Sequence, residues 1–332
     1  ALGREYTLVG DGWSEIKTVN TSEFTAEENQ GSGDSGTPYK KNDIWYYQGL
    51  TGKDNRSFEE LFSYKNVSTG EDNLPIDKVV ATINGVTVTT SMSDGEVKYT
   101  GQEVKDVENN TKLALGIQVF DTLGNSKTIS AQGDYRVDMV APKFVTDDTQ
   151  DLLKSVLSNS EDTVVKGNVT YLRTDRVGIK TDLLGLATDD ESGVGSVVLL
   201  ADGKEITGSE IPANTVDLGI QAKDNVGNTT VVDLGKVSVT DDRVSEDSIV
   251  GSVANNRKYY SDSGNLYYNI QEGLPEFDMR VKDMPLTGIK DIQGGDNTQV
   301  VSKDVNTGNF VVKAVSEGAL SVTVINNLNI SA

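Results

Sequence analysis

The residues of this sequence with the clearest chemical potential are acids that cluster in predicted turns. Calcium takes about six to eight oxygen ligands, and several of them are usually carboxylates. The candidate calcium ligands lie in one predicted turn, near predicted junctions or in a repeated turn: Asp189, Asp190, Glu191, Asp147, Asp148, Asp241, Asp242, Asp121 and Asp224. None follows the spacing of an EF-hand loop. Calcium is therefore the one cofactor that the sequence favours, against the alternative that these acids cap turns and face water.

The composition argues against catalysis. The sequence has no histidine and no cysteine, which removes thiol nucleophiles, serine–histidine triads and the commonest general base. Phosphate-loop and dinucleotide fingerprints are missing as well. Paired carboxylates alone would permit a glycosidase, but repeated domains of about 100 residues leave little sequence for a shaped cleft. We therefore expect no enzyme and no catalytic residues.

Length and charge limit the partners. The chain has 332 residues, enough for about three β-sandwich domains. Its 51 acidic and 30 basic residues give a net charge of −21, which repels phosphate backbones, and no basic patch offsets this charge. No stretch approaches the apolar length of a membrane span. We expect neither a nucleic-acid partner nor a membrane span.

An internal repeat predicts the strands and turns in which several of these acids lie. Residues 115–125 read LGIQVFDTLGN and residues 218–228 read LGIQAKDNVGN, with seven identities at a spacing of 103 residues. The pattern predicts an alternating apolar strand followed by a turn built from Asp, Gly and Asn. Val119 and Ala222 should therefore occupy equivalent positions in their strands.

The repeat extends upstream and, more weakly, into a third copy. DKVVATINGVTV (77–88) parallels GSVVLLADGKEI (195–206), and each carries an Asn-Gly or Asp-Gly hairpin signal. In the third copy, LTGIKDIQGG (286–295) parallels SGVGSVVLLADG, and FVVKAVSEGALSVTV (310–324) parallels the Asp224 strand, turn and strand. The turn there should be Ser316-Glu317-Gly318, without the aspartate.

Domain boundaries follow from the repeat. Asp138-Met139-Val140-Ala141-Pro142 ends the first copy, and Asp241-Asp242-Arg243 stands 103 residues further on. The expected organisation is an N-terminal extended segment or hinge over 1–35, then immunoglobulin-like sandwiches over 36–140 and 141–242 and a divergent one over 243–332. Strand-like residues Glu5–Val9 lie within the first segment. The only helical candidates are Gln150–Leu157 and Ser57–Phe62.

Aromatic residues gather at the predicted module entrances. Asp43–Tyr46, Asn168–Tyr171 and Asn265–Tyr268 share an apolar–x–Tyr strand. A sugar-stacking platform is conceivable at Trp45, but we interpret it as an ordinary strand residue. The same interpretation applies to the four tyrosines Tyr259, Tyr260, Tyr267 and Tyr268, since tyrosine favours strands.

These motifs resemble a known family. The segment ATDDESGVGSVVLLADGKEI, the later IQAKDNVGNTT and the linker VDMVAPKF are similar to the bacterial immunoglobulin-like repeats of surface-layer proteins and large adhesins. The resemblance is close over 136–240, partial over 58–135 and faint over 258–326. It implies an all-β fold of tandem immunoglobulin-like antiparallel β-sandwiches joined by short linkers.

The resemblance also implies a location and a function. We expect a secreted protein of the bacterial cell surface that serves as a non-catalytic structural array, as in a surface layer, and associates with itself or with neighbouring surface proteins. The alternative is an adhesin stalk that binds a host protein or glycan. An intramolecular Lys–Asn or Lys–Asp crosslink is a further possibility in such modules. The wall-anchoring motif and the surface-layer-homology modules found in many such proteins are not present.

Overall fold

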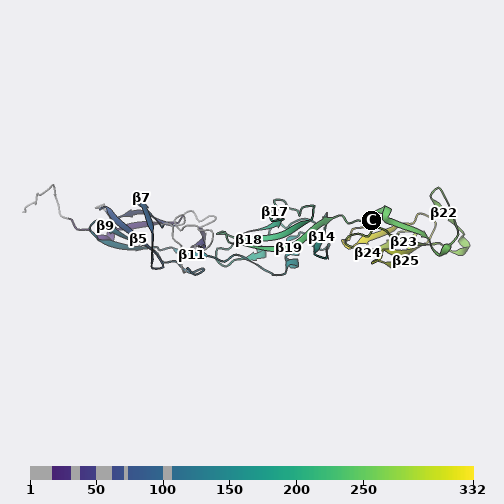
Figure 1. The fold of residues 1–332 in the computed structure, drawn as a ribbon, viewed down its shortest axis with the longest axis horizontal. Helices are drawn as coiled ribbons and strands as arrows, with labels where there is room; N and C mark the ends of the chain where they lie inside the picture. Colours follow the sequence, from purple (N-terminus) through teal and green to yellow (C-terminus); the bar gives the residue numbers. More distant parts are fainter. Residues whose placement is uncertain (1–16, 31–37, 50–61, 71–73, 100–106) are drawn as a thin grey trace, which may run out of the picture. The chain divides into compact units, whose positions relative to one another are not determined.

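The fold of the computed structural model is all-β. The structure describes residues 17–30, 38–49, 62–70, 74–99 and 107–332, and every structural statement below refers to these residues. About 52% of the chain is strand and 8% is helix. Buried hydrophobic side chains form three separate cores within immunoglobulin-like β-sandwiches. Figure 1 draws the strands of these sandwiches as arrows. The expected fold class is confirmed. The sequence-based expectations for Glu5–Val9 and for most of Ser57–Phe62 lie outside the described residues.

The chain packs as two compact units. The first unit comprises the described residues up to Lys143 together with Ala187–Ser196 and Ala222–Thr230. The second unit comprises Phe144–Leu186, Val197–Gln221 and Val231–Ala332. The first core lies in the first unit, and the other two cores lie in the second. No helix in the described part of the chain has the length and apolar character needed to cross a membrane.

The first core is enclosed by three sheets. Its strands are β1 (Thr25–Asn29), β2 (Tyr39–Lys41), β3 (Ile44–Gln48), β4 (Ser63–Ser68), β5 (Ile76–Ile83), β6 (Val86–Val88), β7 (Thr90–Ser93), β8 (Glu96–Tyr99), β9 (Leu115–Asp121), β10 (Ser126–Ser130) and β11 (Asp134–Asp138). The strand orders are β1-β4-β8-β7, β10-β9-β5-β6 and β11-β3-β2. Alternate residues of β9, among them Ile117 and Val119, are buried, as its apolar period of two predicts.

Two features of the first core differ from the expectations. Phe24 is buried and β1 pairs with β4, so residues 24–29 belong to the core rather than to an extended segment or hinge. The physical reason is that Phe24 removes a large apolar side chain from water. The pair β11 and β3 is parallel, with Tyr135 beside Trp45, so the sheets are not purely antiparallel.

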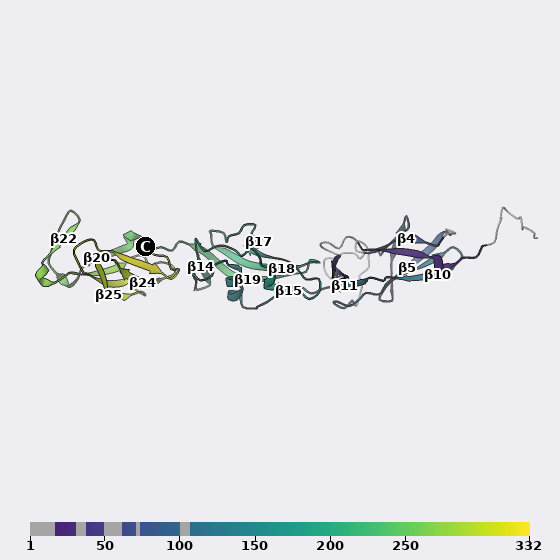
Figure 2. The same ribbon diagram turned by 180° about the vertical axis from the view of Figure 1, so that it is seen from behind.

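The second core is built on one large sheet. Its strands are β12 (Lys143–Phe144), β13 (Thr163–Lys166), β14 (Val169–Arg173), β15 (Ala187–Thr188), β16 (Val194–Ala201), β17 (Lys204–Glu205), β18 (Val216–Asp224) and β19 (Thr229–Thr240). The six-stranded sheet has the order β13-β14-β19-β18-β16-β17, in which β14 and β19 are parallel, and β12 pairs with β15. Figure 2 labels β14, β17, β18 and β19 of this sheet.

The predicted helix Gln150–Leu157 is confirmed as α1 (Thr149–Val156), which contributes to the second core. Asp148 caps the helix, because its carboxylate accepts hydrogen bonds from the backbone N–H groups of Gln150 and Asp151, each at 2.9 Å. Leu152, Leu153 and Val156 lie on one helical face and are buried. In this core, α1 and the segments around Val177 and Ile211 supply the buried side chains that face the sheet.

The third core lies between a four-stranded sheet and a two-stranded one. Its strands are β20 (Ile249–Val253), β21 (Tyr259–Asp262), β22 (Asn265–Tyr268), β23 (Glu276–Val281), β24 (Ile289–Gly294), β25 (Thr298–Asp304), β26 (Asn309–Ala314) and β27 (Val322–Asn326). The strand orders are β20-β23-β26-β25 and β24-β27, and β21 and β22 form a separate hairpin. The alignment of Asn265–Tyr268 with β3 and β14 is therefore wrong, because β22 pairs only with β21.

The internal repeat between the first two copies is confirmed. Val119 and Ala222 are both fully buried, two residues before the strand-ending Asp121 and Asp224. The predicted hairpins form at Asn84-Gly85 and Asp202-Gly203, where all four residues have positive φ angles of 50–79°. Positive φ at both turn positions is what the type I′ hairpin requires.

Candidate metal site

One turn geometry occurs three times. The N–H of Asp121, Asp224 and Asn326 donates to the carbonyl oxygen four residues later, each at 3.0 Å. In each turn the side-chain Oδ1 of the first residue accepts N–H groups two and four residues on, at 2.8–3.0 Å. The third copy therefore has its turn at Asn326–Ile330, and the placement at Ser316–Gly318 is wrong. An asparagine can replace the aspartate because these two bonds need only its side-chain oxygen.

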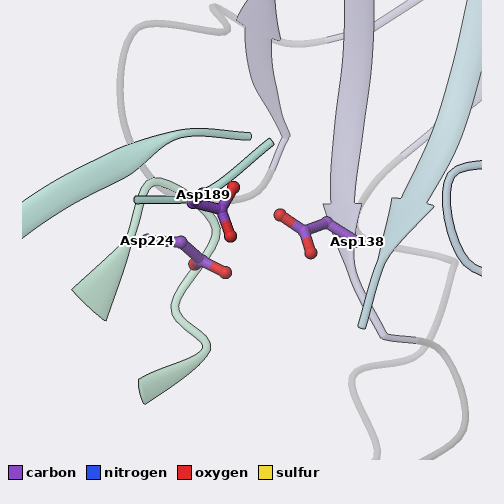
Figure 3. A group of neighbouring side chains, drawn as sticks. All are labelled: Asp138, Asp189 and Asp224. Carbon is purple, nitrogen blue, oxygen red and sulfur yellow. The ribbon is translucent and has the colours of Figure 1, made fainter. Parts of the chain in front are cut away.

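Three aspartates of the first unit face one another. Asp138 is the last residue of β11, Asp189 follows β15, and Asp224 is the last residue of β18. Figure 3 shows their carboxyl groups directed toward a common point. One oxygen from each lies within 4.8 Å of the others, and among the described residues no other group of three potential metal ligands comes this close. We call these three residues the acid cluster.

The hydrogen bonds of the acid cluster leave part of it unsatisfied. Both carboxylate oxygens of Asp224 accept hydrogen bonds. Its Oδ1 accepts from three backbone N–H groups, and its Oδ2 accepts from Asn228 Nδ2 at 2.7 Å. Asp138 Oδ2 accepts the N–H of Ser192 at 3.1 Å. Asp189 Oδ1 accepts the N–H of Gly193 at 2.7 Å, whereas its buried Oδ2 has no hydrogen-bond partner among the described residues.

A buried hydroxyl next to the cluster is also unpartnered. Ser192 is fully buried, and its Oγ makes no hydrogen bond within the described part of the chain. The three acids thus lie close together with two buried, unpartnered oxygen atoms, Asp189 Oδ2 within the acid cluster and Ser192 Oγ next to it. Buried polar atoms are nearly always hydrogen-bonded, so exceptions call for a ligand, an ion or water.

Burial, assisted by neighbouring carboxylates, raises the pKa of two residues of the acid cluster, Asp189 and Asp224. Burial raises the pKa of Asp189 to about 6, and the nearby carboxylates of Asp138 and Asp224 add to the effect against the Gly193 hydrogen bond. Burial also raises the pKa of Asp224, assisted by Asp138 and opposed by the hydrogen bonds from Asn228 and Gly227. The folded chain therefore holds these negative charges at an energetic cost that a cation would relieve.

A comparison with Asp121 shows that the turn by itself does not raise the pKa of its aspartate. Burial acts to raise its pKa as well, but the hydrogen bonds from Asn125, Leu123 and Gly124 outweigh it and lower the pKa below its ordinary value. Asp121 and Asp224 occupy the same turn position. Asp138 is among the groups that raise the pKa of Asp224, and it has no counterpart among those that act on Asp121. Burial that the hydrogen bonds do not outweigh, together with a neighbouring carboxylate, therefore distinguishes Asp224 from Asp121.

The donor set of the acid cluster fits calcium. Two oxygens bound to one ion at about 2.4 Å are at most about 4.8 Å apart, so one ion can touch all three carboxylates. All the available ligand atoms are oxygens, which suits a hard cation. The unpartnered Asp189 Oδ2 supplies a free acceptor. Asp138, Asp189 and Asp224 would hold the ion.

The predicted ligands are thus divided. Asp189 and Asp224 meet in the acid cluster. Glu191 lies beside it, but its Oε1 accepts Asn109 Nδ2 at 2.9 Å. Four other predicted acids are exposed and are not members of the cluster: Asp147, Asp148, Asp190 and Asp241.

Asp138 was not among the predicted ligands. It ends the first copy, in the place where the second copy carries Asp241-Asp242, and that correspondence was the signal that could have identified it.

Asp242 is buried, but it lies in a different setting. Its carboxylate accepts the N–H groups of Leu286 and Thr287, both at 2.7 Å, and the Thr287 hydroxyl at 2.6 Å. Asn326 Nδ2 donates to its carbonyl oxygen. We call Asp242, Thr287 and Asn326 the Asp242 cluster. With one carboxylate and several donors, it needs no cation.

The burial of the lysine side chains does not support the Lys–Asn or Lys–Asp crosslink that the sequence left as a possibility. None of the lysines that the structure describes is buried, whereas the reaction requires a buried lysine beside an asparagine or aspartate.

Comparison with known proteins does not assign this chain to a family. No protein-family model matches the sequence, and no curated protein matches it significantly. The chain is similar to solved structures of fibronectin(III)-like modules of Clostridium thermocellum CbhA, with 13% identity, a TM-score of 0.30 and coverage of 64% of this chain and 94% of that one. It is also similar to the Bacteroides ovatus protein SGBP-B, solved with a mixed-linkage heptasaccharide, with 13% identity, a TM-score of 0.18 and coverage of 91% and 64%.

The human desmocollin-1 ectodomain is a third similar structure, with 13% identity, a TM-score of 0.21 and coverage of 86% of this chain and 55% of that one. At these identities and TM-scores, the similarities carry no argument about function.

Proposed function

We propose that this chain is a non-catalytic structural array of a secreted bacterial surface protein, and that calcium bound by the acid cluster stabilises its first unit. The observation that carries the calcium proposal is the meeting of three carboxylates beside the unpartnered, buried Asp189 Oδ2. A cation would neutralise the charges that raise the pKa of Asp189 and Asp224.

The repeat and the three cores support the structural part of the proposal. We propose modules over 141–242 and 243–332, preceded by a first module that includes β1 in addition to 36–140. The absence of histidine and cysteine from the sequence supports a role without catalysis. Association with further copies or with neighbouring surface proteins is the expected mode of action.

Calcium titration tests the proposal. Thermal unfolding is followed with calcium and then with chelator at matched ionic strength, and bound metal is measured by elemental analysis. At calcium about 100-fold above the dissociation constant, the folded state should gain about 2.7 kcal/mol. Asp189→Asn should abolish this gain, whereas the matched control Asp190→Asn, at the exposed neighbouring position, should retain it. Identical unfolding curves with and without calcium, and no bound metal, would refute the calcium site.

A second candidate function is adhesion to a host protein or glycan. The observation that favours it is the unusual exposure of tyrosine side chains in the third core, where Tyr259, Tyr260 and Tyr267 are 54–67% exposed.

A further inference from the structure

The tyrosines of the β21–β22 hairpin are not ordinary strand residues. All four residues of β21 are exposed, and Tyr260 and Tyr267 lie opposite each other with ring centroids 6.0 Å apart. A cross-strand aromatic pair stabilises a hairpin, which would account for these two rings. It does not account for Tyr259, which is 55% exposed on the other strand face. Figure 1 shows the hairpin standing apart from strands β23 and β25.

Two cavities flank this hairpin. The larger has a volume of about 820 Å³ and is lined by Tyr267, Tyr268, Asn265, Ser316 and Glu317, among others. The smaller, of about 350 Å³, is lined by Tyr259 and by residues of β20 and β23. Leu266, Phe277 and Leu320 line both cavities. These volumes are in the range of ligand sites, which occupy about 300–1,000 Å³.

Tyr268 is held in position at the larger cavity. The guanidinium of Arg257 lies 5.5 Å from the centre of its ring, and Arg257 also donates to the carbonyl oxygens of Asn269 and Gly273. The Tyr268 hydroxyl is buried and has no hydrogen-bond partner among the described residues. The fixed ring of Tyr268 gives the larger cavity an apolar surface on which a ligand can pack.

We call the two cavities beside the hairpin, which share Leu266, Phe277 and Leu320, the tyrosine-lined groove. We propose that this groove binds a neutral saccharide chain. A pyranose ring has an apolar C–H face, which packs on a tyrosine ring, and a rim of hydroxyls, which Asn265, Ser316 and Glu317 can bind. The side chains lining the larger cavity include Glu317 but no lysine or arginine, so an anionic saccharide is disfavoured. This inference rests on the second candidate function and names its ligand class.

Isothermal titration calorimetry with the full chain tests the inference. The probes are short neutral oligosaccharides of the β-glucan, xylan and mannan series, with oligogalacturonate as the anionic comparison. Neutral oligosaccharides of at least one series should bind, and oligogalacturonate should not. Tyr267→Leu should weaken binding about tenfold, since it removes the ring but keeps an apolar side chain, whereas Tyr267→Phe should keep most of the affinity.

Tyr171→Leu, at a half-buried tyrosine of strand β14, is the matched control and should not change saccharide binding. Absence of binding to every neutral series would overturn the inference. So would equal affinity of Tyr267→Leu and the unchanged chain, or preference for the anionic probe. Because the acid cluster lies in the other compact unit, failure here leaves the calcium result intact, and failure of the calcium test leaves saccharide binding unaffected.

Discussion

The acid cluster and the Asp242 cluster share one backbone framework but differ in charge. Asn225 N–H donates to Gly193 carbonyl oxygen as Asn327 N–H donates to Gly288, each at 3.0 Å. The side chains of Asn225 and Asn327 likewise donate to the carbonyl oxygens of Ser192 and Thr287, at 3.0 and 2.7 Å. Gly193 and Gly288 have φ angles of 85° and 89°, where only glycine fits without strain.

The difference lies in the groups placed on this framework. Asn326 stands where the acid cluster has Asp224, and no third carboxylate corresponds to Asp189. Thr287 Oγ1 donates to Asp242, whereas the Ser192 hydroxyl in the corresponding position is unpartnered. The framework therefore forms with a single carboxylate. The two further acids of the acid cluster are not required for the backbone geometry and are available to a cation.

Replacement of Asp242, the one carboxylate of the Asp242 cluster, should have the largest effect on the free energy of unfolding. Asp242→Ala leaves the N–H groups of Leu286 and Thr287 and the Thr287 hydroxyl without their acceptor. We expect a loss of about 3–5 kcal/mol in the free energy of unfolding, measured by denaturant titration and independent of calcium. Asp241→Ala, at the exposed neighbouring acid, should change stability by less than about 0.5 kcal/mol. A small effect of Asp242→Ala would mean that water replaces the carboxylate.

Making the acid cluster more like the Asp242 cluster should remove the calcium effect. Asp224→Asn keeps the Oδ1 bonds of the turn but deletes one of the three charges, so the calcium-dependent gain of about 2.7 kcal/mol should be lost. In chelator, the relief of charge repulsion should be opposed by the loss of the hydrogen bond from Asn228 Nδ2 to Oδ2. The reciprocal Asn326→Asp should not create calcium binding, because it provides only two carboxylates. Calcium stabilisation of the Asp224→Asn chain would contradict the proposed ligand set.

The smallest expected effect is the dependence of stability on pH that Asp189 of the acid cluster contributes. Asp189 has a folded-state pKa of about 6, above its ordinary value of 3.8, so the folded chain binds more protons than the unfolded chain between these values. In chelator, the contribution of Asp189 to stability should therefore be fully present below about pH 4 and fall by about 1 kcal/mol as pH rises through 6, a value reduced by solvent screening at this partly exposed group.

Asp189→Asn should flatten this dependence in denaturant titrations across the same pH range, and Asp190→Asn should leave it unchanged. Calcium binds the deprotonated form, so the stabilisation by calcium should weaken as pH falls through 6. An identical pH profile for Asp189→Asn and the unchanged chain would show that another group titrates.

The sequence by itself determined the features that depend on neighbours along the chain. The alternation before Asp121 and Asp224 predicts the buried positions of Val119 and Ala222, and the Asn-Gly and Asp-Gly pairs predict their hairpins. The Asp–x–x–Gly–Asn turn closes within five residues, so its hydrogen bonds need nothing from the rest of the fold.

Only the tertiary structure decided which acids meet and which tyrosines remain exposed. Asp138 reaches Asp189 and Asp224 because the end of β11 lies against two loops distant in sequence, and no local pattern encodes that approach. The turn at Asn326 escaped the motif because its geometry needs an acceptor oxygen rather than an aspartate. Tyr259 and Tyr267 lie in sequences typical of strands, so the sequence does not predict their exposure. They are exposed because β21 and β22 pair only with each other. Local hydrogen bonds follow from residue type, whereas charge proximity and exposure depend on packing between distant segments.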